Sequence, residues 1–265
     1  MFKISALTLV FAMLSLGQAG AQQLEIINLR VGQGDATLIQ GPADAQGRRV
    51  NVLFDAGNMT NPDGGALIVE ALGAHGVRHL DFFIVSHDDA DHIGGAAAGG
   101  MHGSSFVLGP DQAVGAPGDD DQDGDVDWLD GATFFLPDAE ELGRGDDIRV
   151  GTFLDYGDAL MRETDAIQKY QGMANSMGDR RALNSQADVD SFEINLGGGA
   201  RMLLMAANGY VRGRTTRVPQ VTTQNERSLS FLLSYGGFDY LISGDMIGRA
   251  AGADRSDGRA HPRRD

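Results

Sequence analysis

The densest group of potential metal ligands in the chain is the six-residue segment His87-Asp88-Asp89-Ala90-Asp91-His92. Only Ser86 separates it from residues 79–85, an apolar run with the composition of a buried strand. A tight loop after such a strand can turn several of these side chains toward one point. Because the chain contains no cysteine, a transition metal must be held by imidazole and carboxylate groups, which suit zinc, manganese or iron. We therefore predict a metal site here; the alternative is a solvated acidic turn that caps a helix.

A second acidic run, within an insertion at residues 115–130, has the pattern of a twelve-residue calcium loop. Gly124 and the apolar Val126 fall at the positions that such loops require. The predicted calcium ligands are Asp119, Asp121, Asp123, Asp125, Asp127 and Asp130. The last of these stands where a glutamate normally closes the site, which should weaken the binding. The alternative is a solvated acidic insertion that binds no ion.

Three arginines, Arg212, Arg214 and Arg217, lie close together in a chain that is otherwise strongly acidic. Guanidinium groups bind phosphate oxygens in pairs. We therefore predict that Arg212 and Arg214 contact the substrate; a solvated loop is the alternative. The pair Arg180-Arg181 follows a predicted helix, and basic residues are favoured at the negative end of the helix dipole, so we interpret this pair as a helix C-terminus.

Apolar periodicity predicts strands toward both ends of the chain and helices between them. The predicted elements are strands at 24–31, 35–40 and 50–54, a helix at 65–72, a strand at 79–85, a helix at 164–177, and two β-hairpins, 191–196 with 201–206 and 228–234 with 238–242. This distribution predicts an α/β fold of sandwich type and not a doubly wound sheet of repeated βαβ units. The predicted domain covers residues 22–246, and an irregular tail covers 247–265.

The N-terminal residues have the three parts of a secretory signal peptide. Lys3 supplies a positive charge, residues 4–16 are apolar, and Ala19-Gly20-Ala21 forms a small-residue cleavage site. We therefore predict that residues 1–21 are removed and that the mature protein is periplasmic or extracellular. The apolar run is shorter than the ~20 residues that span a bilayer, so we expect no stable membrane anchor after cleavage.

The formal net charge of −16 restricts the partners of the chain. A strongly negative field repels polyanions, so tight nonspecific binding to DNA is not expected. The predicted partner is a small-molecule substrate or a short nucleic acid. Hydrophobic residues make up 42% of the chain, which is enough for a globular domain with its own core.

Residues 86–95, Ser-His-Asp-Asp-Ala-Asp-His-Ile-Gly-Gly, resemble the HxHxDH signature of the metallo-β-lactamase superfamily, with Asp89 in place of the second histidine. Further segments match in the order that the family has them, over about residues 24–246. They are Val31-Gly32-Gln33-Gly34-Asp35-Ala36, Leu53-Phe54-Asp55-Ala56-Gly57, residues 228–237 and Ser243-Gly244-Asp245. Together they resemble the metallo-β-lactamase domain of the DNA-uptake competence protein ComEC and its free-standing relatives.

This resemblance implies a four-layer αβ/βα sandwich with two divalent cations, zinc being preferred and manganese or iron the alternatives. The implied metal ligands are His87 and Asp89 for one cation, Asp91 and His92 for the other, and Asp245 as the bridge. Asp89 and Asp91 are also the implied catalytic residues. The implied supporting residues are Asp35 and Asp55, and the implied substrate contacts in the matching segment are Asn225 and Ser228.

The chain departs from the family pattern in two places. The superfamily's third histidine, which precedes the Gly-Asp pair, has no counterpart in residues 224–228, although the ComEC type also carries Asn and Ser there. Relatives continue beyond Gly-Asp to a His-His-Gly-Ser ligand motif, whereas His261 is the only histidine that follows Asp245 in this chain. We therefore expect a sandwich shortened at its C-terminus and a second metal site that lacks this ligand.

The sequence thus predicts an exported metal-dependent hydrolase of phosphodiester or other ester bonds, and the resemblance suggests nuclease activity. In such sites two cations ~4 Å apart lower the pKa of a bridging water toward ~7 and stabilise the charge that develops on attack. A β-lactam substrate is not expected, because the histidine pattern differs from that of true lactamases. The alternative is a non-catalytic secreted protein that calcium stabilises and whose transition-metal site is vestigial.

Overall fold

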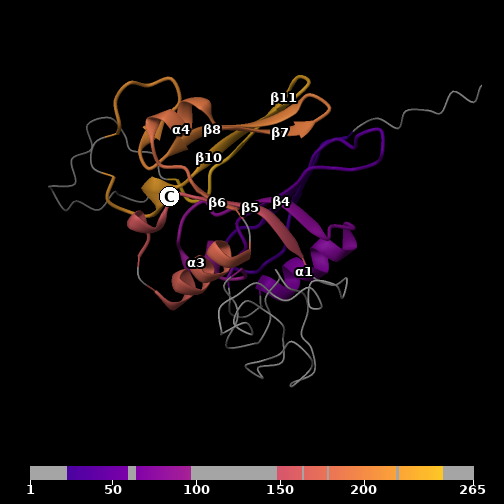
Figure 1. The fold of residues 1–265 in the computed structure, drawn as a ribbon, viewed down its shortest axis with the longest axis horizontal. Helices are drawn as coiled ribbons and strands as arrows, with labels where there is room; N and C mark the ends of the chain where they lie inside the picture. Colours follow the sequence, from indigo (N-terminus) through magenta and orange to yellow (C-terminus); the bar gives the residue numbers. More distant parts are fainter. Residues whose placement is uncertain are drawn as a thin grey trace, which may run out of the picture.

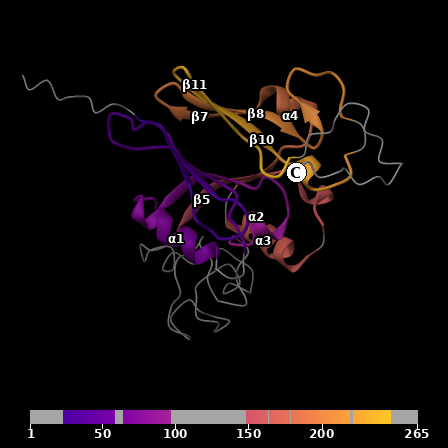
Figure 2. The ribbon, with the colours of Figure 1, turned by 180° about the vertical axis from the view of Figure 1, so that it is seen from behind.

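The computed structural model describes residues 23–58, 64–96, 148–162, 164–177, 179–218 and 221–246. They form a mixed α/β fold of two β-sheets and a few helices, which confirms the α/β class predicted from the sequence. In Figures 1 and 2, the helices α1 (Gly64–Ala74) and α3 (Asp165–Met177) lie on one face of the first sheet, and the second sheet lies on its other face. The first sheet is therefore covered on both sides.

The first sheet has six strands in the order β1-β2-β3-β4-β5-β6. The strands are β1 (Glu25–Asn28), β2 (Thr37–Gln40), β3 (Asn51–Phe54), β4 (His79–Ile84), β5 (Arg149–Asp155) and β6 (Asp179–Ala182). β1 to β3 pair antiparallel, and β3 to β6 pair parallel. Parallel neighbours need a crossover connection. Helix α1 provides it between β3 and β4, and α3 provides it between β5 and β6.

The central strands bury side chains on both faces of this sheet. Leu38 and Leu53 belong to the apolar cluster that includes α1 and α3. Their chain neighbours Ile39, Val52 and Phe54 belong to a second cluster, which lies between the two sheets. Strands that are buried on both faces have continuous apolar sequences in place of alternating ones. This double burial explains why residues 50–54 and 79–85 could be recognised as strands from composition alone.

The second sheet has the order β11-β10-β8-β7, and a short strand, β9, pairs with β8. Its strands are β7 (Glu193–Gly197), β8 (Ala200–Ala207), β9 (Tyr210–Val211), β10 (Ser230–Tyr235) and β11 (Phe238–Ile242). The antiparallel pairs β7–β8 and β10–β11 are the two hairpins predicted from the sequence. Phe54 of the first sheet meets Phe231 of the second edge to face, with 6.3 Å between ring centroids. Helix α4 (Gln186–Ser191) contacts β8 and begins with a capping box between Ser185 and Asp188.

Strands β5 and β6 and helix α4 were not predicted from the sequence. In β5 the apolar pattern is broken by Gly151, where a Cβ would lie 3.0 Å from the carbonyl oxygen of Asp81 in β4, so a larger residue would crowd the neighbouring strand. The prediction that Arg180-Arg181 ends a helix is wrong, because both residues lie in β6 at the edge of the first sheet. Charged residues are common on edge strands, where they oppose pairing with another chain.

Three predictions fall on residues outside the described parts of the chain. They concern the signal peptide at 1–21, the calcium loop within 115–130 and the tail at 247–265. No helix among the described residues is long and apolar enough to cross a membrane.

Asp155, at the end of β5, is a fully buried carboxylate with three hydrogen-bond donors around it. The hydroxyl of Tyr170 in α3 and Nε of Arg180 in β6 each donate over 2.8 Å, and the backbone N–H of Gly157 donates over 2.7 Å. Burial, together with the charge of Asp155, raises the pKa of Tyr170 well above its ordinary value, so its hydroxyl stays protonated. The carboxylate therefore links β5, α3 and β6.

Replacing Arg180 with methionine should lower the free energy of unfolding by about 3–5 kcal/mol, because the change leaves Asp155 buried without its counter-charge. Urea unfolding monitored by circular dichroism measures the loss. Arg181→Met is the matched control: it changes the next residue of β6, whose side chain is 52% exposed, and should cost less than about 1 kcal/mol. Equal losses in the two variants would contradict a special role for the Asp155–Arg180 pair.

Candidate metal centre

Two buried histidines and one aspartate form a group that could bind a metal ion. Ligand atoms of His87, His92 and Asp245 all lie within 4.8 Å of one another. The two imidazole rings are 4.1 Å apart between centroids. The histidines are almost fully buried, whereas the side chain of Asp245 is 47% exposed. The group therefore has a buried imidazole side and a carboxylate side that faces solvent.

The end of β4 and the short helix α2 (Ala90–Ile93) place both histidines in this group. His87 lies in the loop between them, and His92 lies inside α2. Asp245 follows β11, and the preceding Gly244 has a φ of +51°. A Cβ on Gly244 would overlap the hydroxyl of Ser86, so only glycine lets the two loops approach this closely. The approach brings Oδ1 of Asp245 to 3.5 Å from Nε2 of His92.

Asp55, which directly follows β3, orients the loop that carries the histidines. Its fully buried carboxylate accepts hydrogen bonds from the backbone N–H of Ser86 (2.7 Å), the hydroxyl of Ser86 (2.6 Å) and Nδ1 of His92 (2.8 Å). Asp55 has a φ of +59°, a conformation that costs a non-glycine residue about 1–3 kcal/mol. The three hydrogen bonds offset this cost and fix the orientation of the His92 ring.

The same bonds determine which nitrogen of each histidine is free. The single hydroxyl proton of Ser86 is donated to Asp55, so the Ser86 oxygen must accept from Nδ1 of His87, 2.9 Å away. In His92, Nδ1 likewise donates to Asp55. Each ring therefore presents Nε2 toward the group. This is the arrangement that carboxylate and hydroxyl partners impose on metal-binding histidines.

Nε2 of His87 is buried and has no hydrogen-bond partner within the described structure. Oδ2 of Asp89 lies 3.4 Å from it, without the geometry of a hydrogen bond. A buried nitrogen without a partner costs free energy, and a bound cation would remove that cost. Two imidazole nitrogens and a carboxylate are also a donor set that zinc accepts. The residues present therefore fit a metal ion.

The two histidines differ in their pKa values. Burial lowers the pKa of His87, and a charge on His92 lowers it further. Burial also acts to lower the pKa of His92, but the hydrogen bond from His92 to Asp55 and the charges of Asp55 and Asp245 outweigh it and raise the pKa to about 9. At neutral pH without metal, His92 thus carries a proton on Nε2 facing Asp245, while His87 is neutral. A cation must displace that proton to bind His92.

In the metal-free protein, the imidazole of His92 should titrate near pH 9, and Asp55→Asn should lower this pKa, because the hydrogen bond to a charged carboxylate is lost while burial and the weaker charges of Asp245 and Asp91 remain. Nuclear magnetic resonance titration of the imidazole signals measures both values. Zinc affinity should correspondingly rise between pH 7 and pH 9 as the proton leaves. A His92 pKa unaffected by Asp55→Asn would contradict the assigned hydrogen bond.

The raised pKa of His92 also links stability to pH. Below the unfolded value of about 6.5, both the folded and unfolded states hold the proton and the full stabilising contribution is present. Between pH 6.5 and pH 9 only the folded state holds it, so the contribution is lost as the pH rises. The difference in unfolding free energy between the metal-free protein and His92→Asn should therefore shrink across this range. Urea unfolding at several pH values tests this, and a difference that grows with pH would contradict it.

The two aspartates assigned to separate metals occupy different positions. Oδ1 of Asp89 is bonded to Nη2 of Arg162, and Oδ2 faces His87. Asp91, in α2, accepts a hydrogen bond of 3.4 Å from the side chain of Gln33. The resemblance assigns His87 and His92 to two different cations. Asp55 and Ser86 hold the two rings side by side, so that ligand atoms of both histidines lie within 4.8 Å of one another.

Asn225 and Ser228, which were predicted to contact the substrate, lie in the segment that precedes β10. Asn225 begins the 3-10 helix η3 (Asn225–Arg227), and Ser228 is fully buried with a hydroxyl that has no partner within the described structure. The N–H of Leu229 donates to the carbonyl of Ser86 over 2.9 Å, which places this segment beside the histidine loop.

The two arginines predicted to contact the substrate, Arg212 and Arg214, lie in the turn after β9. Arg212 donates from Nε, Nη1 and Nη2 to the backbone carbonyls of Leu204, Asp190 and Phe192 at 2.7–2.9 Å. Through these bonds Arg212 joins the backbone of β8 to that of the segment at 190–192, so its guanidinium is not free to bind an anion. Arg214 is exposed in the same turn.

Asp35, predicted to support the ligand loop, has an exposed side chain. Its backbone carbonyl accepts a hydrogen bond of 2.9 Å from Gly57, which follows the Asp55 turn. Asp35 also lines a cavity of about 180 Å³ together with Asp55 and Gly244. It therefore contacts the supporting loop through its backbone.

A buried carboxylate next to the candidate ligands, that of Asp88, was not predicted from the sequence. Asp88 is 1% exposed and accepts hydrogen bonds from the hydroxyl of Tyr156 (2.5 Å) and the backbone N–H of Arg162 (2.7 Å). Burial and the charge of Asp88 raise the pKa of Tyr156, so its hydroxyl remains a donor. No signal in the sequence separates Asp88 from its acidic neighbours, since its partners lie more than sixty residues away.

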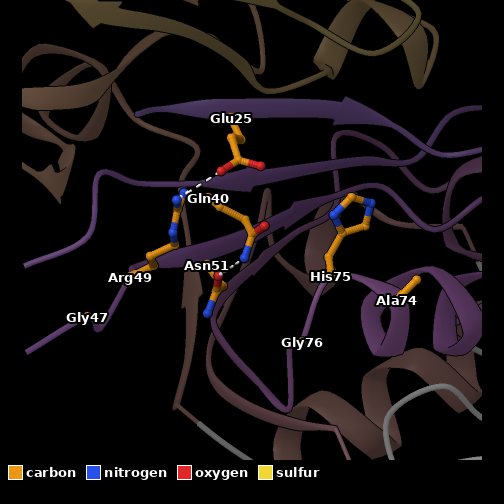
Figure 3. Close-up of a pocket in the computed structure, with 8 residues that line it drawn as sticks. All are labelled: Glu25, Gln40, Gly47, Arg49, Asn51, Ala74, His75 and Gly76. Atoms are coloured by element: carbon orange, nitrogen blue, oxygen red, sulfur yellow. Dashed lines mark hydrogen bonds and ion pairs between the residues drawn. The ribbon is translucent and has the colours of Figure 1, made fainter. Parts of the chain in front are cut away.

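A larger polar cavity, of about 490 Å³, is shared by β1, β2, β3 and the end of α1 (Figure 3). The side chain of Arg49 forms an ion pair of 2.9 Å with Glu25, and that of Gln40 donates to Asn51 over 3.0 Å. These lining groups are thus paired with each other. None of the residues that line this cavity belongs to the metal-binding group.

In comparisons with known proteins, no family model and no curated protein matches this chain. Its function is therefore inferred from the geometry around His87, His92 and Asp245.

Proposed function

We propose that this chain is a metal-dependent hydrolase of phosphodiester or other ester bonds, of the ComEC-like type within the metallo-β-lactamase superfamily. The observation that carries the proposal is the convergence of three metal-ligating side chains, His87, His92 and Asp245, within 4.8 Å. Two of them present a buried Nε2, and that of His87 has no partner within the described structure. A buried, unpartnered imidazole nitrogen is costly for a protein that binds no cation there.

The sequence segments that resemble the superfamily meet at the histidine loop, and this supports the proposal. The segment at 53–57 reaches the histidine loop through the bond from the N–H of Ala56 to the carbonyl of His92, 2.6 Å long. The segment at 228–237 reaches it through Leu229, and Gly244 packs on Ser86. Two face-to-face sheets with α1 and α3 outside the first are likewise consistent with a four-layer αβ/βα sandwich.

His87, His92 and Asp245 would hold a cation in this proposal, with a carboxylate oxygen of Asp89 3.4 Å from Nε2 of His87 and Asp91 left for a second cation. Zinc fits the imidazole nitrogens best, and manganese or iron are the alternatives. When bound, such a cation acts as a Lewis acid that polarises the scissile bond and lowers the pKa of water. Asp55 holds His92 in place and stabilises positive charge on it. The half-exposed Asp245 is the carboxylate open to substrate and to protons from solvent.

The distribution of charge favours a compact substrate. The formal net charge of −16 disfavours long polyanions, and Arg212, predicted to contact the substrate, is bonded to backbone carbonyls. A single phosphodiester or ester group that reaches the exposed Asp245 edge fits these constraints. Activity on long duplex DNA should accordingly be weak compared with activity on a small diester.

The test combines metal analysis with hydrolysis of bis(p-nitrophenyl) phosphate. We expect purified protein to bind up to two zinc equivalents and to release nitrophenol, and we expect His87→Ala to lower both zinc content and turnover by at least about tenfold. His79→Ala is the control, since this histidine is half exposed and outside the metal-binding group. Protein that binds calcium but no transition metal and shows no turnover would support the non-catalytic alternative.

A further inference from the structure

Arg162 connects the two acidic neighbours of the metal ligands. It lies between the 3-10 helix η2 (Asp158–Leu160) and α3, and its side chain is 48% exposed. Its Nη2 donates to the backbone carbonyl of Asp88 over 2.8 Å and is bonded to Oδ1 of Asp89. Its Nε lies 3.4 Å from the carboxylate of Asp88. The guanidinium of Arg162 thus binds two consecutive residues, Asp88 and Asp89, of the histidine loop between β4 and α2.

The position of Arg162 is itself fixed from several directions. The backbone N–H of Arg162 donates to Oδ2 of Asp88 over 2.7 Å, so the backbone of Arg162 is anchored before its side chain turns back. Asp88 is in turn held by the hydroxyl of Tyr156 and, over 3.4 Å, by the side chain of Gln224. Asp88 is therefore held by residues from two other segments, and it in turn anchors the backbone of Arg162.

The contacts of Arg162 determine the orientation of the Asp89 carboxylate. With Oδ1 bonded to Arg162, the other oxygen, Oδ2, lies 3.4 Å from the unpartnered Nε2 of His87. Asp89 is the N-terminal cap residue of α2, but its side chain makes no capping hydrogen bond. Its carboxylate is therefore directed by Arg162 and not by the helix.

We propose that Arg162 is a positioning residue of the metal centre, which holds one oxygen of Asp89 so that the other becomes a ligand beside Nε2 of His87. This inference rests on the proposed metal centre, in which Asp89 is already an implied ligand, and it assigns to Arg162 the orientation of that carboxylate. A fixed carboxylate loses less conformational freedom on binding a cation than a mobile one. Removal of an outer partner that orients a ligand typically weakens metal binding 10–100-fold.

Zinc titration against a chromogenic chelator tests this role in the full chain. Arg162→Gln should weaken zinc binding by about 10–100-fold, and Arg162→Lys by less, because lysine keeps the charge but not the forked geometry. The visible spectrum of bound Co²⁺ should also change in Arg162→Gln, which reports the ligand set independently of turnover. Arg181→Gln is the matched control, since its side chain is 52% exposed and lies 3.7 Å from Asp188; zinc affinity should be unchanged.

A double-mutant cycle separates positioning from general support of the loop. In an Asp89→Asn background, adding Arg162→Gln or Arg162→Lys should cause no further loss of zinc affinity. A loss that persists in that background would overturn the proposal, because Arg162 would then act through Asp88. If Arg162→Gln does not fold, the zinc affinities of Arg162→Lys with and without Asp89→Asn are compared instead. Unchanged affinity in both single variants would overturn the role of Arg162 alone, whereas no zinc binding by the unaltered protein would overturn the metal centre and this role together.

Discussion

The candidate metal centre depends on one buried carboxylate. Asp55 has no exposure to solvent and a left-handed backbone conformation, both of which are unfavourable for an aspartate by themselves. Its three donors, two from Ser86 and one from His92, satisfy the buried charge. The same bonds define the tautomers of both histidines, since the proton that Ser86 gives to Asp55 obliges the Ser86 oxygen to accept from His87. One interaction therefore orients the ligand loop and selects the nitrogens that it presents.

The surrounding structure lets other segments approach this carboxylate closely. A Cβ on Gly244 would overlap Ser86, and one on Gly34 would overlap the backbone of Asp91. Both glycines have positive φ values, so they supply close approach and an unusual backbone conformation at once. The two sheets contribute the rest: β3 and β4 end at Asp55 and at the histidine loop, and the β10–β11 hairpin delivers Asp245. The site lies where the ends of these strands meet.

Much of the fold could be predicted from the sequence because its central strands are buried on both faces and its hairpins have glycine turns. The α/β class and both hairpins are confirmed. Strand β6 could not be recognised, since its sequence is polar and the ion pairs of Arg180 with Asp155 and Asp158 form only in the folded chain. Helix α4 could have been found from its Ser-x-x-Asp capping box at Ser185. The elements that were missed are those that tertiary contacts or caps stabilise.

The types of side chain that meet at the candidate site could be predicted from spacing, but the contacts that position each of them could not. Adjacent residues in a loop can point in opposite directions, and Asp88 and Asp89 differ in this way: one is buried against Tyr156, and the other faces His87. The placement of both histidines in one group follows from Asp55, thirty-two residues before the first of them. The role of Arg162 likewise depends on contacts across more than seventy residues of sequence.

A crystal structure of the zinc-soaked protein, with an anomalous difference map collected at the zinc edge, tests the central claim most directly. We expect a peak about 2.0–2.1 Å from Nε2 of both His87 and His92, with a carboxylate oxygen of Asp245 completing the group. Nδ1 of each ring should keep its bond to Ser86 or Asp55. A map with no peak beside the two Nε2 atoms, or with zinc bound only at exposed carboxylates elsewhere, would contradict the assignment of this group as a metal centre.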